Sequence, residues 1–116
     1  ALEMVGELAS NEENGIVASI VEGIDRESLR ELALAVREQE KVRAVILGTA
    51  PTDGGAALIA AVKNDSGLDA GTILSQAAKT IGGGGRPNAE LTIVGGKNPE
   101  NLEEALEQAR TAAQTS

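Results

Sequence analysis

The 116-residue sequence contains no histidine, no cysteine and no aromatic side chain. Without histidine, Ser-His-Asp and Cys-His catalysis and histidine-ligated metal sites are excluded. Without cysteine there is no disulfide framework, no thiol nucleophile and no thiolate metal site, a composition compatible with the cytosol. An enzyme built on this chain would have to use carboxylates, lysine, arginine, hydroxyl groups or backbone amides.

Positive charge is scarce, and long apolar runs are missing. Ten Lys and Arg residues face 18 Asp and Glu residues, which gives a net charge of −8 and argues against broad, non-specific binding of nucleic acid. Glycine or charged residues interrupt every apolar run, so we expect no transmembrane helix and no membrane partner. Residues 1–10 lack the basic start and apolar centre of a signal peptide. One stretch, residues 79–97, is locally basic, with Lys79, Arg86 and Lys97 against Glu90.

What is present predicts one α/β domain. With 41% hydrophobic residues, the chain can bury a core of Leu, Ile, Val and Ala. Short β-branched runs predict strands, and apolar residues at i, i+3, i+4 and i+7 predict amphipathic helices. We expect a mixed four- to five-stranded sheet with three main helices packed on it, preceded by an N-terminal linker-helix tail. The predicted strands are residues 16–21, 42–47, 56–62 and 89–94, and the predicted helices are residues 26–40, 70–81 and a last one from residue 99.

Single residues predict where the helices begin. Asp25 and Asp69 are good N-caps, while Asn98 and Pro99 suit the cap and first position of the last helix.

Leu32 lies in the middle of the apolar stripe of the first long helix and is expected to be buried. The periodic pattern dissolves from Thr111, which predicts a tail. Residues 1–14 have a rough helical face and are either the end of an incoming helix or a frayed terminus.

Four consecutive glycines at residues 82–85, followed by Arg86, Pro87 and Asn88, are the most distinctive feature. They follow a predicted helix, so they are not a dinucleotide fingerprint, in which the glycines open a helix. No Gly-Lys-Ser/Thr ends them, so they are not a P-loop. A run of free N–H groups beside a guanidinium can hold a phosphate or a flat base edge. The alternative is a long helix-to-strand turn.

No carboxylate arrangement in the sequence predicts catalysis or a metal site. Glu103, Glu104 and Glu107 fall on the predicted surface of the last helix, where a solvated face is the expected role.

The segments IGGGGRPN and GGKNPENLEEAL, with the DGG hairpin and the Ala-Gly helix start, resemble the C-terminal globular domain of alanyl-tRNA synthetases, the C-Ala domain, of the DHH-associated family. The similarity covers nearly the whole chain. It implies a non-catalytic module that helps to hold the elbow of tRNA. Residues 1–14 would end a helical linker, and residues 15–116 would form the globular domain. The sequence departs from the family pattern at Asn88-Ala89-Glu90 and in its longer apolar run, residues 91–94.

The resemblance also implies partners, cofactors and a site. The partners would be the elbow of tRNA(Ala), the aminoacylation and editing domains of the same chain, and a second copy in a homodimer. The domain itself would need no cofactor, whereas the full-length ATP-dependent ligase uses ATP, Mg and Zn in the cytoplasm. The tRNA-binding residues would be Gly82, Gly83, Gly84, Gly85, Arg86, Pro87 and Asn88, with Lys79 and Lys97 nearby.

Two other functions remain open on the sequence. The same fold occurs as the substrate-binding domain of DHH-type phosphoesterases, whose glycine loop resembles Gly-Gly-His-x-x-Ala. Arg86 stands where that histidine would be, which favours the synthetase branch. The third hypothesis is an oligomerisation domain in which the glycine run is only a connector.

Overall fold

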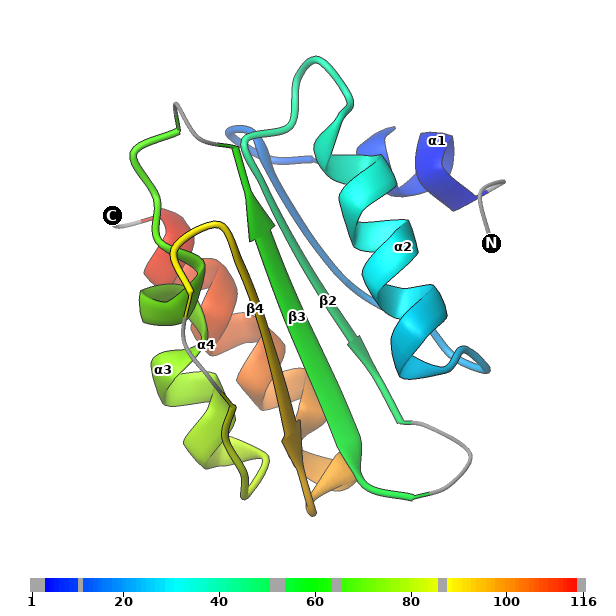
Figure 1. Ribbon diagram of the computed structural model, residues 1–116, viewed down its shortest axis with the longest axis vertical. Coiled ribbons are helices and arrows are strands. Elements are labelled where there is room, and N and C mark those ends of the chain that lie inside the picture. The colour runs from blue at the N-terminus through cyan, green and yellow to red at the C-terminus, as the bar shows by residue number, and fades with distance from the viewer. Residues whose placement is uncertain (1–3, 11, 51–53, 64–65, 86–87, 115–116) are drawn as a thin grey trace.

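The fold is described by a computed structural model for residues 4–10, 12–50, 54–63, 66–85 and 88–114. Helices and strands alternate in the first half, and the chain then adds a hairpin, a helix, a strand and a last helix (Figure 1). The elements are α1 (Met4–Ser10), β1 (Ile16–Ile20), α2 (Arg26–Arg37), β2 (Ala44–Thr49), β3 (Ala56–Val62), α3 (Ala70–Thr80), β4 (Leu91–Gly96), the 3-10 helix η1 (Pro99–Asn101) and α4 (Leu102–Gln114).

The four strands form one mixed sheet in the order β1-β2-β3-β4. β1 and β2 are parallel because α2 carries the chain back between them, as parallel neighbours require. β2 and β3 are antiparallel, with Ala44 opposite Val62 at one end and Thr49 opposite Ala57 at the other. β3 and β4 are also antiparallel. The predicted α/β class, mixed sheet and three main helices are confirmed.

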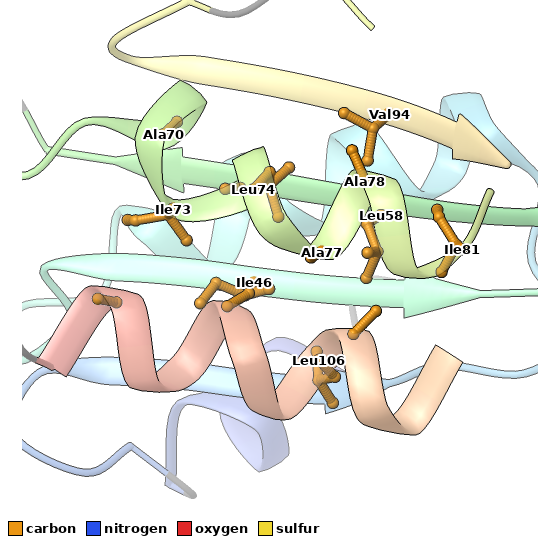
Figure 2. Close-up of a cluster of buried hydrophobic side chains, with 14 of the residues drawn as sticks. Ile46, Leu58, Ala70, Ile73, Leu74, Ala77, Ala78, Ile81, Val94 and Leu106 are labelled. Atoms are coloured by element: carbon orange, nitrogen blue, oxygen red, sulfur yellow. The ribbon is translucent and has the colours of Figure 1, made fainter. Parts of the chain in front are cut away.

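Helices cover both faces of the sheet. Figure 1 shows α3 and α4 on one side and α1 and α2 on the other. On the first side, Ile46 and Leu58 of the sheet pack against Leu74 and Leu106 of the helices (Figure 2). On the second, α2 places its stripe, including Leu32 with no exposed surface, on Val45 and Ile59. Both cores are aliphatic, as the composition requires.

Two aspartates begin the helices as predicted. The Asp25 carboxylate accepts the Ser28 N–H at 2.7 Å, and the Asp69 carboxylate accepts the Thr72 N–H at 3.0 Å. Each bond satisfies one of the N–H groups that a helix start leaves without an intrahelical partner. The hydrogen bond from the Ser28 backbone holds the pKa of Asp25 below its ordinary value of 3.8.

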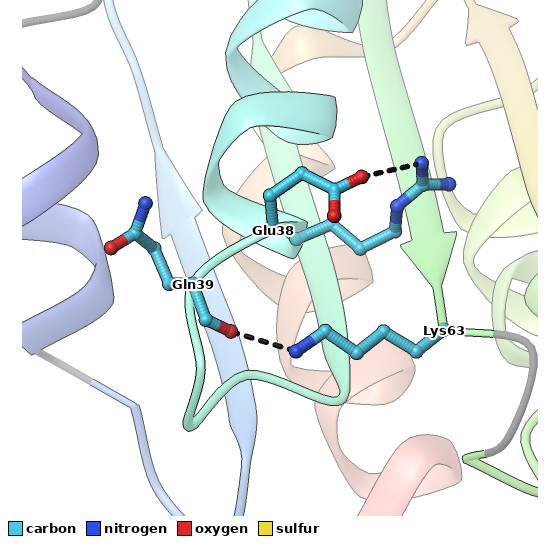
Figure 3. A network of polar contacts seen from close by, with 4 residues as sticks. Glu38, Gln39 and Lys63 are labelled. Carbon is cyan, nitrogen blue, oxygen red and sulfur yellow. Dashed lines mark hydrogen bonds and ion pairs between the residues drawn. The ribbon is translucent and has the colours of Figure 1, made fainter.

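The first long helix is shorter than the sequence pattern predicts, and the second strand starts later. α2 ends at Arg37 rather than at residue 40, and the chain then turns, with the Val42 N–H donating to the Gln39 carbonyl at 3.1 Å. Lys63, which follows β3, donates its Nζ to the same carbonyl at 2.8 Å (Figure 3). This turn uses residues 38–43, so β2 begins at Ala44 and runs to Thr49.

The C-terminal helix differs from the prediction at both ends. Pro99 opens a 3-10 turn rather than the α-helix, and the Asn98 side chain makes no capping hydrogen bond. At the other end, no tail begins at Thr111, because α4 continues to Gln114. Ala113 is buried in the core shared by the sheet, α3 and α4. Ala113 lies four residues after the buried Ala109, so the apolar stripe of α4 continues past Thr111.

Candidate nucleic-acid interface

The glycine run begins as the C-terminal cap of α3. Gly82 has a φ of +76°, the left-handed conformation that glycine adopts without strain. Its N–H donates to the Lys79 carbonyl at 3.0 Å, and the Gly83 N–H donates to the Ala78 carbonyl at 2.9 Å. These two bonds form a Schellman motif. They satisfy carbonyls at the end of α3.

Beyond the cap, the glycine run pairs with the outer edge of β4. The Gly84 N–H donates to the Gly95 carbonyl at 3.1 Å, and the Gly95 N–H donates back to the Gly84 carbonyl at 3.4 Å. The hypothesis of free N–H groups is therefore wrong for residues 82–84, because each of these N–H groups already donates to a carbonyl. The run is bonded to the sheet and does not form an open anion-binding nest.

Close approach of neighbouring backbone explains why residues 83 and 85 of the run, and residue 96 of β4, are glycine. A Cβ on Gly83 would overlap the Gly95 carbonyl oxygen, one on Gly85 would overlap the Ile93 carbonyl oxygen, and one on Gly96 would overlap the Ile81 carbonyl oxygen. At Gly84, by contrast, a Cβ would meet nothing within 4 Å, and φ lies outside the left-handed range. Gly84 is the one member of residues 82–85 with both open space and an unstrained conformation.

The fourth strand lies two residues later than predicted. The carbonyls of Asn88 and Ala89 accept the N–H groups of Gly71 and Ala70 at the start of α3, at 3.1 and 2.9 Å. These bonds hold residues 88–90 in a turn, so the strand begins at Leu91. At its other end, Gly95 and Gly96 belong to the strand and not to a turn, because they pair with Ala57 and Ala56 of β3.

Asn88, a predicted tRNA-binding residue, has a structural role in this turn. Its Oδ1 accepts the N–H of Glu90 at 2.9 Å and that of Leu91 at 3.4 Å. Its backbone N–H donates to the buried Thr92 hydroxyl at 2.9 Å, and that hydroxyl donates to the Asn88 carbonyl at 2.7 Å. The turn thus sets the start of β4 beside the start of α3.

A pocket of about 250 Å³ lies between the glycine run, α3 and β4, and we call it the glycine pocket. Its lining is mainly apolar, with a lysine that is exposed to solvent. α3 contributes Leu74, Ser75, Ala78 and Lys79, the glycine run contributes residues 83–85, and β4 contributes Thr92 and Val94. The structure therefore brings predicted residues 79 and 83–85 together around one hollow.

Sequence reasoning missed two polar residues near these glycines. Ser75 lines the glycine pocket from an exposed position on α3. Nη2 of Arg26 lies 3.9 Å from the position that a Cβ on Gly95 would occupy. Arg26 begins α2 and is 69 residues away from Gly95 in sequence, so only the folded structure could reveal that the two residues are neighbours. Of the remaining predicted site residues, Lys97 is exposed directly after β4, and Arg86 and Pro87 lie outside the described residues.

A larger hollow of about 730 Å³ lies elsewhere, where β1 ends and α4 begins. Its lining includes the carboxylates of Glu22, Glu100 and Glu103. Three negative charges repel phosphate, so this hollow is the poorer candidate for nucleic acid.

Within the described part of the chain, no cluster of three acidic, histidine or cysteine side chains could hold a metal ion. None of the described helices is long and apolar enough to cross a membrane.

Residues 12–115, which are nearly the whole chain, match the DHHA1 domain family. The chain belongs to the DHHA1 family. Relatives of this DHHA1 domain include the alanine–tRNA ligase of Chlorobium luteolum, 41% identical over 110 residues, and that of Desulforudis audaxviator, 39% identical over 111 residues. The matches cover 88% and 93% of the chain but only 12% of each ligase. The DHHA1 domain thus corresponds to a small part of these enzymes.

The fold agrees with the sequence comparison. The crystal structure of the C-Ala domain from Aquifex aeolicus alanyl-tRNA synthetase superimposes with a TM-score of 0.75 at 24% identity. The match covers 88% of this chain and 96% of that domain. The resemblance to the C-Ala domain of alanyl-tRNA synthetases is therefore confirmed.

Proposed function

We propose that this DHHA1 domain is a non-catalytic tRNA-binding module of an alanyl-tRNA synthetase, and that its glycine run helps to hold the elbow of tRNA(Ala). In the whole protein, residues 1–14 would end a helical linker from the aminoacylation and editing domains. Residues 15–116 would form the globular module. The ATP-dependent ligation of alanine to tRNA, with its ATP, Mg and Zn, would belong to those other domains, in the cytoplasm.

One observation carries the proposal. Gly84 is exposed and has open space around it, while its neighbours Gly83 and Gly85 are packed against the backbone of β4. The sheet edge thus offers a bare backbone surface on which a ligand can come close, next to the exposed cation of Lys79. RNA recognition of this kind depends on local shape and a few charges. It suits a domain whose net charge is −8.

Titration of folded tRNA with the chain, at fixed salt concentration, tests the proposal. Gly84→Val should weaken binding because its side chain fills the space that the RNA needs, while the added Cβ meets nothing within 4 Å in the fold. Lys79→Ala and Arg86→Ala should each weaken binding by about 1–3 kcal/mol, the size of a hydrogen bond to a charged group. Lys41→Ala is the matched control, because Lys41 is also exposed and lines neither hollow.

The slope of affinity against salt concentration should be shallow, because so acidic a domain can engage few phosphates. Unchanged affinity in all three site variants, with intact circular dichroism spectra, would reduce the glycine run to a connector. An oligomerisation role would then be favoured.

A further inference from the structure

The glycine pocket has an unusual combination of walls. Residues 83–85 present peptide groups without side chains, and the α3 residues Gly71, Ser75 and Ala78 are all small. Leu74 and Val94, both buried, supply the apolar surface. Walls made of backbone and small side chains let a flat ligand approach closely.

We infer that the glycine pocket receives one unstacked nucleobase of the bound RNA, with Lys79 contacting the adjacent phosphate. This inference rests on the proposed function and names the chemical group that occupies the pocket. RNA is read mainly through loops whose bases can leave the stack and enter such pockets. The chain has no aromatic residue, so the base would lie on peptide planes and aliphatic carbon.

Polar groups at the pocket favour a base over an aliphatic side chain from a protein partner. A base carries hydrogen-bonding edges, which are costly to bury without partners. Ser75 brings a hydroxyl to the lining, and Lys79 brings an exposed cation that would pair with phosphate. An aliphatic side chain would use neither group.

Filling the pocket tests the inference. Ser75→Leu places a larger side chain in the lining from an exposed position on α3, where leucine also favours the helix. Thr72→Leu is the matched control, since Thr72 is exposed on the same helix and does not line the pocket. Ser75→Leu should weaken tRNA binding about tenfold, which corresponds to a loss of about 1.4 kcal/mol in binding free energy. Thr72→Leu should leave binding unchanged.

Base insertion itself can be seen by fluorescence. The adenine analogue 2-aminopurine, which brightens when it leaves a base stack, is placed in turn at each unpaired position of the tRNA elbow loops. The protein has no aromatic side chain to fluoresce or to quench the probe. One position should brighten when the chain binds, and Ser75→Leu, but not Thr72→Leu, should abolish that change.

The possible failures are distinguishable. If tRNA binds and depends on Gly84 but no position brightens, or Ser75→Leu binds normally, the base-insertion inference is wrong and the proposed function stands. If the unmodified chain does not bind tRNA, both are wrong. If Ser75→Leu disrupts self-association instead of RNA binding, the pocket receives a protein side chain and the inference is overturned.

Discussion

Gly84 and Gly95 exchange two backbone hydrogen bonds, at 3.1 and 3.4 Å, across the outer edge of β4. Neither residue has a side chain, so the pair forms a strip of bare backbone at the rim of the sheet. The surrounding glycines make this pairing possible, because a Cβ on Gly83 would overlap the Gly95 carbonyl. The glycine run is therefore both part of the fold and part of the candidate interface.

Gly83 and Gly84 should differ sharply in how much an alanine substitution changes the free energy of unfolding. Gly83→Ala should lower the free energy of unfolding by about 1–3 kcal/mol or more, the usual cost of overpacking. Gly84→Ala should change it by less than about 0.5 kcal/mol, because the added Cβ meets open space. Urea unfolding followed by far-ultraviolet circular dichroism measures both. Equal losses would mean that the glycine run does not pack on β4 as described.

Alanine substitutions at Leu32 and Arg37 test which side of α2 is buried. Leu32 has no exposed surface, so Leu32→Ala should cost about 2–5 kcal/mol in unfolding free energy. Arg37 makes an ion pair at 3.3 Å with the exposed carboxylate of Glu38, and Arg37→Ala should cost less than about 0.5 kcal/mol. Similar losses in the two variants would contradict the orientation of the helix.

Asp25 should make stability depend on pH in the acid range. Its pKa is lowered in the folded chain because its carboxylate accepts the Ser28 N–H. The stabilisation is therefore present above the ordinary value of 3.8 and is lost as pH falls through the folded pKa. Asp25→Asn keeps an oxygen acceptor but does not titrate. The stability advantage of Asp25 over the asparagine variant should shrink as pH falls through this window, and an advantage independent of pH would refute the coupling.

Thr92 should hold the turn before β4. Its buried hydroxyl bonds both the N–H and the carbonyl of Asn88. Thr92→Val keeps the shape but removes both bonds, and should cost about 1–3 kcal/mol. Hydrogen exchange at the Asn88 amide should accelerate in this variant and stay slow in Thr92→Ser, which retains the hydroxyl. Equal protection in both variants would show that the hydroxyl does not hold the turn.

Much of the fold could be predicted because its signals are local. The i, i+3, i+4, i+7 spacing of Leu29, Leu32, Ala33 and Val36 matches the buried residues of α2, and Asp25 and Asp69 cap the helices they precede. The C-terminal boundary was missed because the stripe continues only through Ala113, four residues after Ala109, and a small alanine followed by polar residues is a weak apolar signal.

The site could be predicted only in part. The sequence singles out four glycines beside cations, and the structure groups residues 79 and 83–85 of that prediction around the glycine pocket. The pairing of Gly84 with Gly95 could not be predicted, since two glycines carry no side-chain pattern that fixes register. Ser75 was missed because its relevance depends on how α3 lies beside the glycine run.

The backbone pair at Gly84 and Gly95 also limits how copies of this chain can assemble. An edge strand with unpaired peptide groups can recruit a strand from another molecule and extend the sheet. Here Gly84 already occupies the N–H and carbonyl of Gly95, so intermolecular strand addition is blocked at that end of β4. Strand addition in a homodimer of this domain would therefore have to use another part of the sheet edge, such as β1 at the opposite side of the sheet, which would leave the glycine surface available to another ligand.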